Sequence, residues 1–307
     1  MKVVFLEPLG LKISQIEDAC QGLRQAGHEV VVYPDRNETF DELVRRAEGA
    51  DVIVESNIPL RKDFLDACPN LKMLSIAFTG LDHIDMEECR RRGIEVMNAA
   101  GYSTEAVAEL AIALMIDVFR KVRDNDLITR QCDRKGLMPG REIGGKTVGI
   151  VGMGNIGQRV AKIAQAFGCR VLAWNRTKKE VEGVAFVDKD TLLRQSDIIT
   201  LHIALNDETR DFITAKDFAL MKPSAILVNT ARGPVVNETA LAEALKSNTI
   251  AGAATDVYGQ EPPLKKDNPL FDAPNLIMLP HIGFATEEAF VLRLGIVVKN
   301  VENWMKG

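Results

Sequence analysis

The sequence predicts an α/β protein with two parallel-sheet domains, and three observations support this prediction. The chain has 307 residues, 46% of them hydrophobic, which is enough to fill two cores. Short apolar runs alternate with amphipathic stretches in two successive series, as strands and helices do in parallel sheets. A glycine-rich turn opens the second series at Gly152 instead of near residue 10. We therefore expect a complete smaller domain before it.

The first series gives that smaller domain, over residues 1–100. Its predicted strands are residues 3–6, 29–33, 51–54, 73–77 and 94–96, and its predicted helices include residues 16–26 and 41–48. A longer helix from about 103 to 123 follows, with Ser103 or Thr104 as its N-cap. Residues 131–145 are polar and glycine-rich, so we expect a connection there.

The second series gives the larger domain, over residues 101–283. Its predicted strands are residues 147–151, 170–174, 197–201, 225–229, 250–256 and 276–279. A final helix at about 287–304 is expected to return the chain to the first domain, so that residues 284–307 complete it. Ligands of such sheets bind beyond the carboxyl ends of the strands, so the residues that follow each strand are the informative ones.

The glycine turn is the first candidate site. Gly152, Gly154 and Gly157 fit the pattern G-x-G-x-x-G between an apolar strand and an amphipathic helix. Such glycines allow a tight turn, a close approach of the backbone to a pyrophosphate and a close contact of helix with strand. The N–H groups of Asn155 and Ile156 would lie at the positive end of the helix. The pattern predicts dinucleotide binding, with a plain strand-to-helix turn as the alternative.

Composition excludes several classes of function. The net charge of −5 argues against a nucleic-acid partner, because DNA or RNA phosphates attract a basic face. The five cysteines (20, 68, 89, 132 and 169) lack metal-site spacing and are expected to be free thiols. No apolar run reaches the roughly 20 residues of a membrane span, and no signal peptide is evident. We expect a soluble cytoplasmic protein without a metal.

Three residues at predicted strand ends carry groups suited to acid–base chemistry. Arg232 follows the strand at 225–229, and its guanidinium can bind a carboxylate through two hydrogen bonds. His281 follows the last strand and titrates near neutral pH. Glu261 lies in a proline-rich loop and could pair with His281, which would favour the imidazolium and fix the tautomer. The alternatives are a surface arginine and a surface glutamate, and spacing alone does not decide them.

The other three histidines have simpler interpretations. His28 lies in a helix-to-strand turn and is expected to be solvated. His202 ends the strand at 197–201 and is interpreted as a structural hydrogen-bonding residue that lines the cofactor site. His83 could serve either a structural or a functional role.

The order of these motifs resembles the D-isomer-specific 2-hydroxyacid dehydrogenase family, over most of the chain. The glycine motif is followed by His202-Ile-Ala-Leu, Asn229-Thr-Ala-Arg-Gly-Pro-Val-Val, Asp256-Val-Tyr-Gly-Gln-Glu-Pro-Pro and Leu279-Pro-His-Ile-Gly. The resemblance implies two Rossmann-like or flavodoxin-like domains with parallel sheets and an active-site cleft between them. It also implies reduction of a 2-keto acid to a D-2-hydroxy acid, and it suggests a homodimer formed through the nucleotide domains.

The resemblance assigns roles to individual residues. It implies that His281 is the acid/base, that Glu261 holds this histidine and that Arg232 binds and polarises the keto acid. The implied substrate-binding residues are Phe78, Thr79, Gly80, Tyr102 and Arg232. The predicted cofactor-binding residues are Thr104, Gly152, Gly154, Asn155, Ile156, Gly157, Asn175, Arg176, Thr177, His202, Ala204, Thr230, Ala231, Asp256 and Gly283.

Two departures from the family pattern refine the prediction. NAD-using members carry an acidic residue where this chain has Asn175 followed by Arg176, so we expect NADP(H) to be favoured over NAD(H). The alternative is that Arg176 and the following lysines are a solvated loop. Phosphoglycerate-using relatives carry arginines where this chain has Glu55 and Ile76, and Phe78 replaces a small residue. Because a carboxylate would repel a phosphate, a small unphosphorylated keto acid such as glyoxylate or hydroxypyruvate is expected.

Two other functions remain alternatives. One branch of the family resembles transcriptional corepressors, so a nucleotide-sensing binding protein is possible in principle, although the chain lacks extended low-complexity tails. D-3-phosphoglycerate dehydrogenase is the other, but we expect no C-terminal regulatory domain. A short-chain dehydrogenase is disfavoured because neither Tyr102 nor Tyr258 has a lysine four residues later. The position of the glycine motif disfavours an L-specific lactate-type enzyme.

Overall fold

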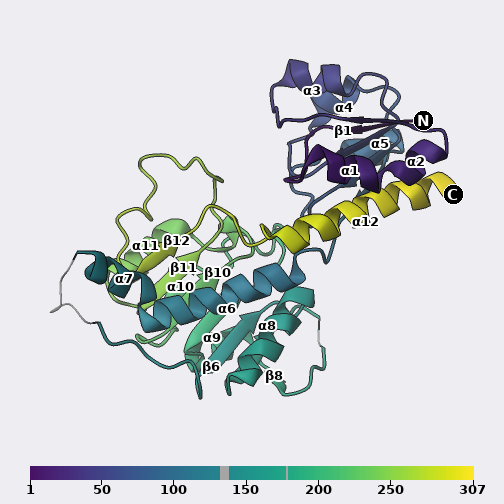
Figure 1. Ribbon diagram of the computed structural model, residues 1–307. Coiled ribbons are helices and arrows are strands. Elements are labelled where there is room, and N and C mark those ends of the chain that lie inside the picture. The colour runs from purple at the N-terminus through teal and green to yellow at the C-terminus, as the bar shows by residue number, and fades with distance from the viewer. Residues whose placement is uncertain (132–137, 178) are drawn as a thin grey trace. The chain divides into compact units, whose positions relative to one another are not determined.

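The computed structural model describes residues 1–131, 138–177 and 179–307, and the chain divides into two compact units (Figure 1). The first unit consists of Met1–Ser103 together with Ala285–Gly307, and the second is Thr104–Phe284. Cys132 and Lys178, which the sequence interpretation included, lie outside the described residues. Each unit is an α/β structure with one parallel sheet, as the sequence predicts.

The first unit is built on a five-stranded parallel sheet in the order β2-β1-β3-β4-β5. Its strands are β1 (Lys2–Phe5), β2 (Glu29–Val32), β3 (Val52–Glu55), β4 (Met73–Ile76) and β5 (Glu95–Asn98). Its helices are α1 (Ile13–Ala19), α2 (Gln21–Gln25), α3 (Phe40–Arg46), α4 (Lys62–Asp66), α5 (Met86–Arg92) and α12 (Glu287–Lys306). β3 and β4 are buried at every position, as expected for central strands covered on both faces.

Helix α12 belongs to the first unit although it comes from the end of the chain. It packs against β4 and β5, and Ser75 Oγ donates a hydrogen bond of 3.1 Å to the carbonyl of Val297. Arg293 on the same helix is buried and donates to the carbonyl oxygens of Leu9 and Ala77. The sheet of the first unit is therefore covered partly by residues that lie about 200 positions later in sequence.

The second unit contains a seven-stranded parallel sheet in the order β12-β11-β10-β9-β6-β7-β8. Its strands are β6 (Thr147–Val151), β7 (Arg170–Trp174), β8 (Val184–Phe186), β9 (Ile198–Leu201), β10 (Ile226–Asn229), β11 (Gly252–Thr255) and β12 (Leu276–Met278). Its helices are α6 (Thr104–Arg120), α7 (Val122–Arg130), α8 (Asn155–Ala166), α9 (Lys189–Gln195), α10 (Ala215–Phe218), α11 (Glu238–Lys246) and the 3-10 turn η1 (Gly233–Val235).

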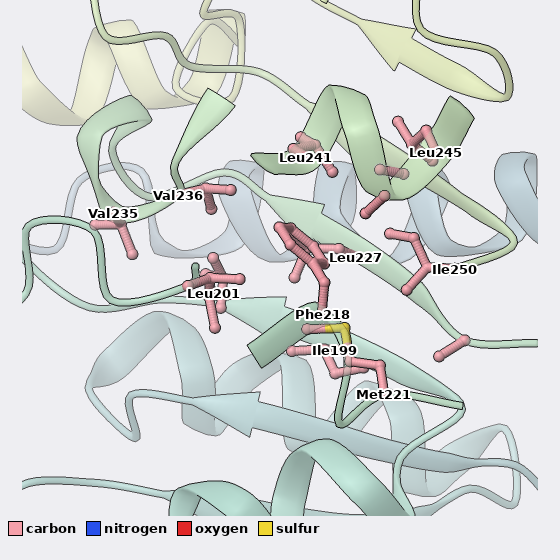
Figure 2. Close-up of a cluster of buried hydrophobic side chains, with 14 of the residues drawn as sticks. Ile199, Leu201, Phe218, Met221, Leu227, Val235, Val236, Leu241, Leu245 and Ile250 are labelled. Carbon is pink, nitrogen blue, oxygen red and sulfur yellow. The ribbon is translucent and has the colours of Figure 1, made fainter. Parts of the chain in front are cut away.

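Two apolar cores cover the two faces of this sheet. On one face α6 and α8 pack on the strands through small and branched side chains such as Ala108, Ala111 and Val160. On the other face α9, α10 and α11 pack around Phe218, and Figure 2 shows Leu227 of β10 and Leu241 of α11 in this cluster. The reversal of strand order between β6 and β9 lies at the middle of the sheet, where open α/β sheets bind ligands.

The structure differs from the predicted elements in three places. The helix predicted at 103–123 ends at Arg120, because Lys121 adopts a left-handed backbone conformation (φ 51°), and a separate helix α7 follows. The helix predicted at 16–26 is divided into α1 and α2 at Cys20. Strand β8 was not predicted, since three residues at a sheet edge leave too short a pattern to recognise. Most other predicted strands differ by one or two residues at their ends.

Candidate active site

The glycine turn after β6 has the geometry that the sequence pattern predicts. Gly152 has φ 98°, and a Cβ there would lie 2.5 Å from the carbonyl oxygen of His202. A Cβ on Gly157 would overlap the carbonyl of Gly152, so the helix can approach the strand only without a side chain. No described atom lies within 4 Å of a Cβ built on Gly154. The first and third glycines are thus required by packing, and the second leaves open space.

Helix α8 begins directly at this open position. Gly154 is its N-cap in an extended conformation, and Asn155 and Ile156 are its first residues. The first N–H groups of a helix lack partners within the helix and carry its positive end. A phosphate group that approaches Gly154 would meet these donors without hindrance from a side chain.

The side chain of Asn175, which follows β7, bonds the backbone of the glycine turn after β6. Its Oδ1 accepts a hydrogen bond of 3.0 Å from the N–H of Met153, and its Nδ2 donates to the carbonyl of Thr177 at 2.6 Å. The side chain of this predicted cofactor-binding residue therefore also holds the glycine turn and its own loop. Lys179 adds to the same contact, because its ammonium donates to the carbonyl of Met153 at 2.9 Å.

Arg176 extends from the same loop and pairs with a carboxylate from the loop after β9. Its Nη1 lies 3.2 Å from Oε2 of Glu208, and both side chains are about three-quarters exposed, at 74% and 73%. The loop is shaped by Asn206, whose Oδ1 accepts the N–H groups of Glu208 and Thr209, and by Thr209, whose hydroxyl donates to the carbonyl of Ala204. A basic loop and an acidic loop thus meet beside the glycine turn.

Two buried polar atoms lie at the ends of β9 and β10. Nε2 of His202 lies 2.9 Å from the hydroxyl of Thr200, and burial lowers the pKa of His202 to about 3. Nδ1 of His202 and the hydroxyl of Thr230 are both buried and have no hydrogen-bond partner among the described residues. Because buried polar atoms are normally hydrogen-bonded, unsatisfied ones indicate a ligand or water. Together with the open glycine turn, these atoms fit a dinucleotide bound along this edge of the sheet.

The loop that carries Arg232 is held by buried Asn229 of β10. Its Oδ1 accepts the N–H of Ala231, and its Nδ2 donates to the carbonyl of Arg232, each at 3.1 Å. Nη1 of Arg232 donates to the carbonyl of Ala231 at 2.8 Å. A Cβ on Gly233 would overlap the backbone of Tyr258, so the loops after β10 and β11 are in direct contact. The guanidinium is therefore presented by a tightly fixed turn.

His281 and Glu261 are brought together, as the sequence interpretation proposed. Nδ1 of His281 lies 3.1 Å from Oε2 of Glu261, with side-chain exposures of 20% and 45%. His281 has a positive φ of 59°, which is uncommon for a residue with a side chain and marks strain held by the surrounding structure. A neutral His281 that donates from Nδ1 to the carboxylate keeps Nε2 as a proton acceptor, and the protonated ring can donate from it.

Asp256 holds the turn that follows His281. Its two carboxylate oxygens accept the N–H groups of Ile282 at 2.8 Å and Gly283 at 2.7 Å. Burial raises the pKa of Asp256, and the two N–H donors and the nearby His281 partly oppose that rise. Gly283, which was predicted to be a cofactor-binding residue, thus already donates its N–H to Asp256. Asp256 fixes the backbone on which His281 stands.

Among the predicted substrate residues of the first unit, Phe78, Thr79 and Gly80 follow β4, and Tyr102 follows β5. Phe78 and Tyr102 form a tilted ring pair with centroids 6.4 Å apart, and both are buried. The carbonyl of Thr79 accepts a hydrogen bond of 2.7 Å from Nδ2 of Asn98, which fixes the turn before Gly80. Tyr102 also lies beside the guanidinium of Arg293.

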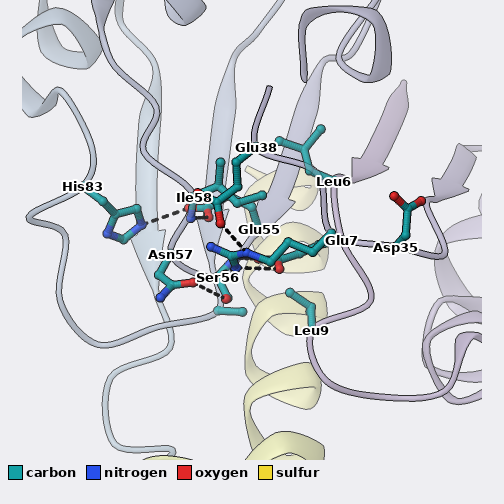
Figure 3. Close-up of polar contacts among 12 residues, drawn as sticks. Leu6, Glu7, Leu9, Asp35, Glu38, Glu55, Ser56, Asn57, Ile58 and His83 are labelled. Atoms are coloured by element: carbon teal, nitrogen blue, oxygen red, sulfur yellow. Dashed lines mark hydrogen bonds and ion pairs between the residues drawn. The ribbon is translucent and has the colours of Figure 1, made fainter. Parts of the chain in front are cut away.

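Glu55 is placed differently from the interpretation that set it against a substrate phosphate. Its side chain is fully buried, and its carboxylate accepts the N–H of Ile58 at 2.6 Å and lies 3.0 Å from Nε2 of His83 (Figure 3). Burial raises the pKa of this carboxyl, while His83 opposes the rise. Glu55 therefore serves first as an acceptor that holds the loop after β3.

Sequence reasoning did not single out Glu208 and Asn229. Glu208 comes from the loop after β9, which is separated from β7 only by β6 in the sheet, so strand order was needed to find it. Asn229 was quoted only as part of a motif, and its hydrogen bonds to the Arg232 loop could not be read from spacing. In the part of the chain that the structure describes, no group of His, Cys, Asp or Glu side chains is arranged to hold a metal ion. The described helices include none that is both long and apolar enough to cross a membrane.

Comparison with known proteins gives one family. The family model described as "D-isomer specific 2-hydroxyacid dehydrogenase, NAD binding domain" matches residues 112–283. Glyoxylate reductase of Thermococcus litoralis is 41% identical over 278 residues, which cover 87% of this chain and 83% of that protein. Glycerate dehydrogenase of Methylorubrum extorquens is 38% identical over 315 residues, which cover 100% of this chain and 96% of that protein.

A solved structure supports the same assignment. An acyclic imino acid reductase, crystallised with NADPH and D-Arg, superposes with a TM-score of 0.90 at 32% identity and covers 100% of this chain and 97% of its own. The site geometry, the family match and these relatives agree. The chain therefore belongs to the D-isomer-specific 2-hydroxyacid dehydrogenase family and is an oxidoreductase that uses a nicotinamide coenzyme.

Proposed function

We propose that the protein reduces a small unphosphorylated 2-keto acid, with glyoxylate and hydroxypyruvate as the first candidates, to the D-2-hydroxy acid. The single observation that carries this proposal is the pair of His281 and Glu261, 3.1 Å apart, in the same unit as the glycine turn. An imidazole held by a carboxylate is suited to give a proton to an oxygen on which negative charge develops.

Different residues would bind the substrate, stabilise the developing charge and donate the proton. Arg232 would bind the substrate carboxylate and stabilise charge on the keto oxygen, because its loop is fixed by Asn229 and Gly233. His281 would donate its proton from Nε2, with Glu261 setting the ring orientation and Asp256 the backbone. The backbone N–H groups of Thr79 and Gly80 would hold the substrate carboxylate. When bound, the reduced nicotinamide supplies the hydride.

The small substrate is supported by the relatives and by the first unit. The two curated relatives are named for glyoxylate and for glycerate, which is the product of hydroxypyruvate reduction. Phe78 and Tyr102 supply apolar surface beside the predicted carboxylate loop. A phosphoglycerate dehydrogenase or a nucleotide-sensing binding protein has no better support.

We infer a preference for NADP(H) over NAD(H). Arg176 offers a guanidinium at the loop where a 2′-phosphate would lie, and Asn175 carries no charge that would repel it. The solved imino acid reductase holds NADPH, whereas the family model is described as NAD-binding, so the preference has to be measured.

We further propose a homodimer formed through the second unit, in the cytoplasm. Helix α7 has no buried residue, and it exposes Val122 and Leu127, while Phe167 and Phe271 of the same unit are exposed as well. We take these exposed side chains as the candidate contacts of the dimer that the resemblance to the family suggests. Light scattering of the wild type and of a Val122→Glu, Leu127→Glu variant tests this, and a wild-type monomer would refute it. The described cysteines are free, which suits a reducing compartment.

The test of the main proposal is a grid of initial rates, with NADPH and NADH each set against glyoxylate, hydroxypyruvate, pyruvate and phenylpyruvate. We expect turnover of one or more of the three small keto acids and a lower KM for NADPH than for NADH. Binding of nucleotide without reduction of any keto acid would overturn the proposal and favour a nucleotide sensor.

A further inference from the structure

Two buried carboxylates stand at adjacent strand ends of the first unit, and both serve the loop after β3 (Figure 3). Glu7, which follows β1, accepts the N–H of Ser56 at 2.9 Å and the guanidinium of Arg36 at 2.7 Å. Glu55 accepts the N–H of Ile58 and pairs with His83. The two carboxylates have the same set of partners, one backbone N–H donor and one basic side chain.

The bond to Glu55 fixes which nitrogen of His83 carries the proton. When Glu55 is ionised and the ring is neutral, Nε2 carries the N–H that the carboxylate accepts, and Nδ1 is then a lone-pair acceptor. Nδ1 lies on the side of the ring that faces away from Glu55 (Figure 3). None of the described residues bonds it.

The ring of His83 also lies against Phe78, one of the residues proposed to bind substrate. Its ring meets Phe78 edge-on with centroids 6.4 Å apart, and Phe78 in turn meets Tyr102. The N–H of Leu60 donates to the carbonyl of His83 at 3.0 Å, so the backbone at this position is held as firmly as the ring. His83, Phe78 and Tyr102 form a run of ring contacts, and the imidazole of His83 brings a nitrogen acceptor to it.

We propose that His83, held by Glu55, is a specificity-determining residue that selects 2-keto acids with a hydroxyl on the carbon next to the keto group. This inference rests on the proposed function and deepens it, because it ranks hydroxypyruvate above pyruvate and glyoxylate. The hydroxyl donates to Nδ1 of His83, while Phe78 and Tyr102 cover the carbon chain. Glyoxylate has no such group, and the methyl group of pyruvate would leave Nδ1 without a partner at a cost in binding.

The same arrangement disfavours a phosphate in place of the hydroxyl. A phosphate presents only acceptor oxygens and negative charge to the lone pair of Nδ1, and the Glu55 carboxylate lies directly behind the ring. Glu55 thus acts against phosphorylated substrates through His83, although its own side chain is buried.

The experiment compares hydroxypyruvate with pyruvate, because the two differ by one hydroxyl. The variant His83→Phe keeps the ring and removes both nitrogens. Glu55→Gln keeps an acceptor for Ile58 but can donate an N–H to Nε2, which permits the other tautomer and turns Nδ1 into a donor. Glu7→Gln is the matched control, at the neighbouring carboxylate with the same hydrogen-bond pattern. kcat and KM are measured separately for both keto acids, together with NADPH affinity and the melting temperature.

We expect the ratio of kcat/KM for hydroxypyruvate to that for pyruvate to fall about 10-fold in His83→Phe and about 3-fold in Glu55→Gln, as expected for loss of one hydrogen bond. The loss should be in the KM of hydroxypyruvate, and Glu7→Gln should leave the ratio unchanged. An unchanged ratio in both variants overturns the inference, as does an equal loss for both keto acids. A wild-type enzyme that reduces pyruvate as well as hydroxypyruvate overturns it too, whereas a wild type that reduces neither defeats the proposed function itself.

Discussion

Nδ1 of His281 lies 3.1 Å from Oε2 of Glu261, although the two residues come from different loops of the second unit. If this histidine is the proton donor, His281→Ala should lower kcat by about 10²–10⁴-fold, the range for loss of general acid–base catalysis. NADPH affinity should change less than twofold, since the glycine turn is untouched. Steady-state kinetics and fluorescence titration of NADPH measure the two quantities, and a parallel loss of both would reject the assignment.

Glu261→Gln tests the partner of His281 and should have a milder effect than His281→Ala. The amide can still accept from Nδ1 but carries no charge, so the orientation of the ring survives while the imidazolium loses its stabilisation. We expect a smaller loss of kcat than in His281→Ala, measured by the same steady-state kinetics. Identical losses in the two variants would mean that Glu261 acts only by keeping the loop folded.

Coenzyme choice should depend on Glu208 as well as on Arg176. Nη1 of Arg176 lies 3.2 Å from Oε2 of Glu208, so a 2′-phosphate must share or displace this pair. Arg176→Ala should weaken NADPH binding by about 10-fold, as for loss of a charged hydrogen bond, and leave NADH binding unchanged. Glu208→Gln should strengthen NADPH binding by about 2–5-fold, because exposed ion pairs contribute little.

The double variant separates the two effects. If Glu208 acts through Arg176, Glu208→Gln should have no effect on NADPH affinity in the Arg176→Ala background. Asp207→Asn is the matched control, since it removes a neighbouring charge of the same loop without touching the pair. Isothermal titration with NADPH and NADH measures the affinities. Equal changes in affinity for NADPH and NADH would show that this loop does not recognise the 2′-phosphate.

The fold and much of the site could be predicted because they depend on local patterns. Strand, glycine turn and helix are consecutive between Thr147 and Ala166, and the apolar spacing identifies each of them. His281 and Glu261 were brought together by the motifs of the family, with spacing alone leaving the pair open. Strand order, in contrast, cannot be predicted from any local sequence pattern. The pairing of Arg176 with Glu208 depends on it and was therefore not predicted.

Side chains with two possible partners were the hardest to predict. Glu55 was interpreted as a charge beside the substrate, but burial and two donors make it an internal acceptor. Most of helix α7 was not predicted, because it contributes nothing to the core, and core contacts are what makes an amphipathic pattern recognisable. For Glu55 and for α7, the deciding information is which groups of the folded chain lie next to them.

Two glycines of the turn, Gly154 and Gly157, should respond differently to substitution. Gly157→Ala forces a methyl group into the carbonyl of Gly152 and should destabilise the second unit by about 1–3 kcal/mol, as overpacking does. Gly154→Ala meets no described atom, so the melting temperature should stay within a few degrees while NADPH binding weakens. Thermal unfolding with and without NADPH measures both effects. A strongly destabilised Gly154→Ala protein would contradict the open geometry at that position.

The buried histidine of the second unit should make its stability depend on acid. Burial lowers the pKa of His202 to about 3, against 6.5 for the free side chain. Between these values the unfolded chain binds a proton at this position and the folded chain does not. The free energy of unfolding should therefore fall as the pH is lowered from 6.5, by up to about 1.4 kcal/mol per pH unit from this group alone.

His202→Gln should flatten that dependence, because the amide can still bond Thr200 but does not titrate. Urea unfolding at pH 6.5, 5.5 and 4.5 measures the slope, and Trp174 in β7 reports on the second unit once Trp304 of α12 is replaced by Phe. His28→Gln is the control, since that histidine belongs to the first unit and should leave the slope unchanged. An unchanged slope in His202→Gln would mean that the ring is solvated and that burial does not suppress its protonation. A flattened slope would instead identify His202 as a neutral donor or acceptor throughout the working pH range, which is the state in which its unpaired Nδ1 can bond a coenzyme.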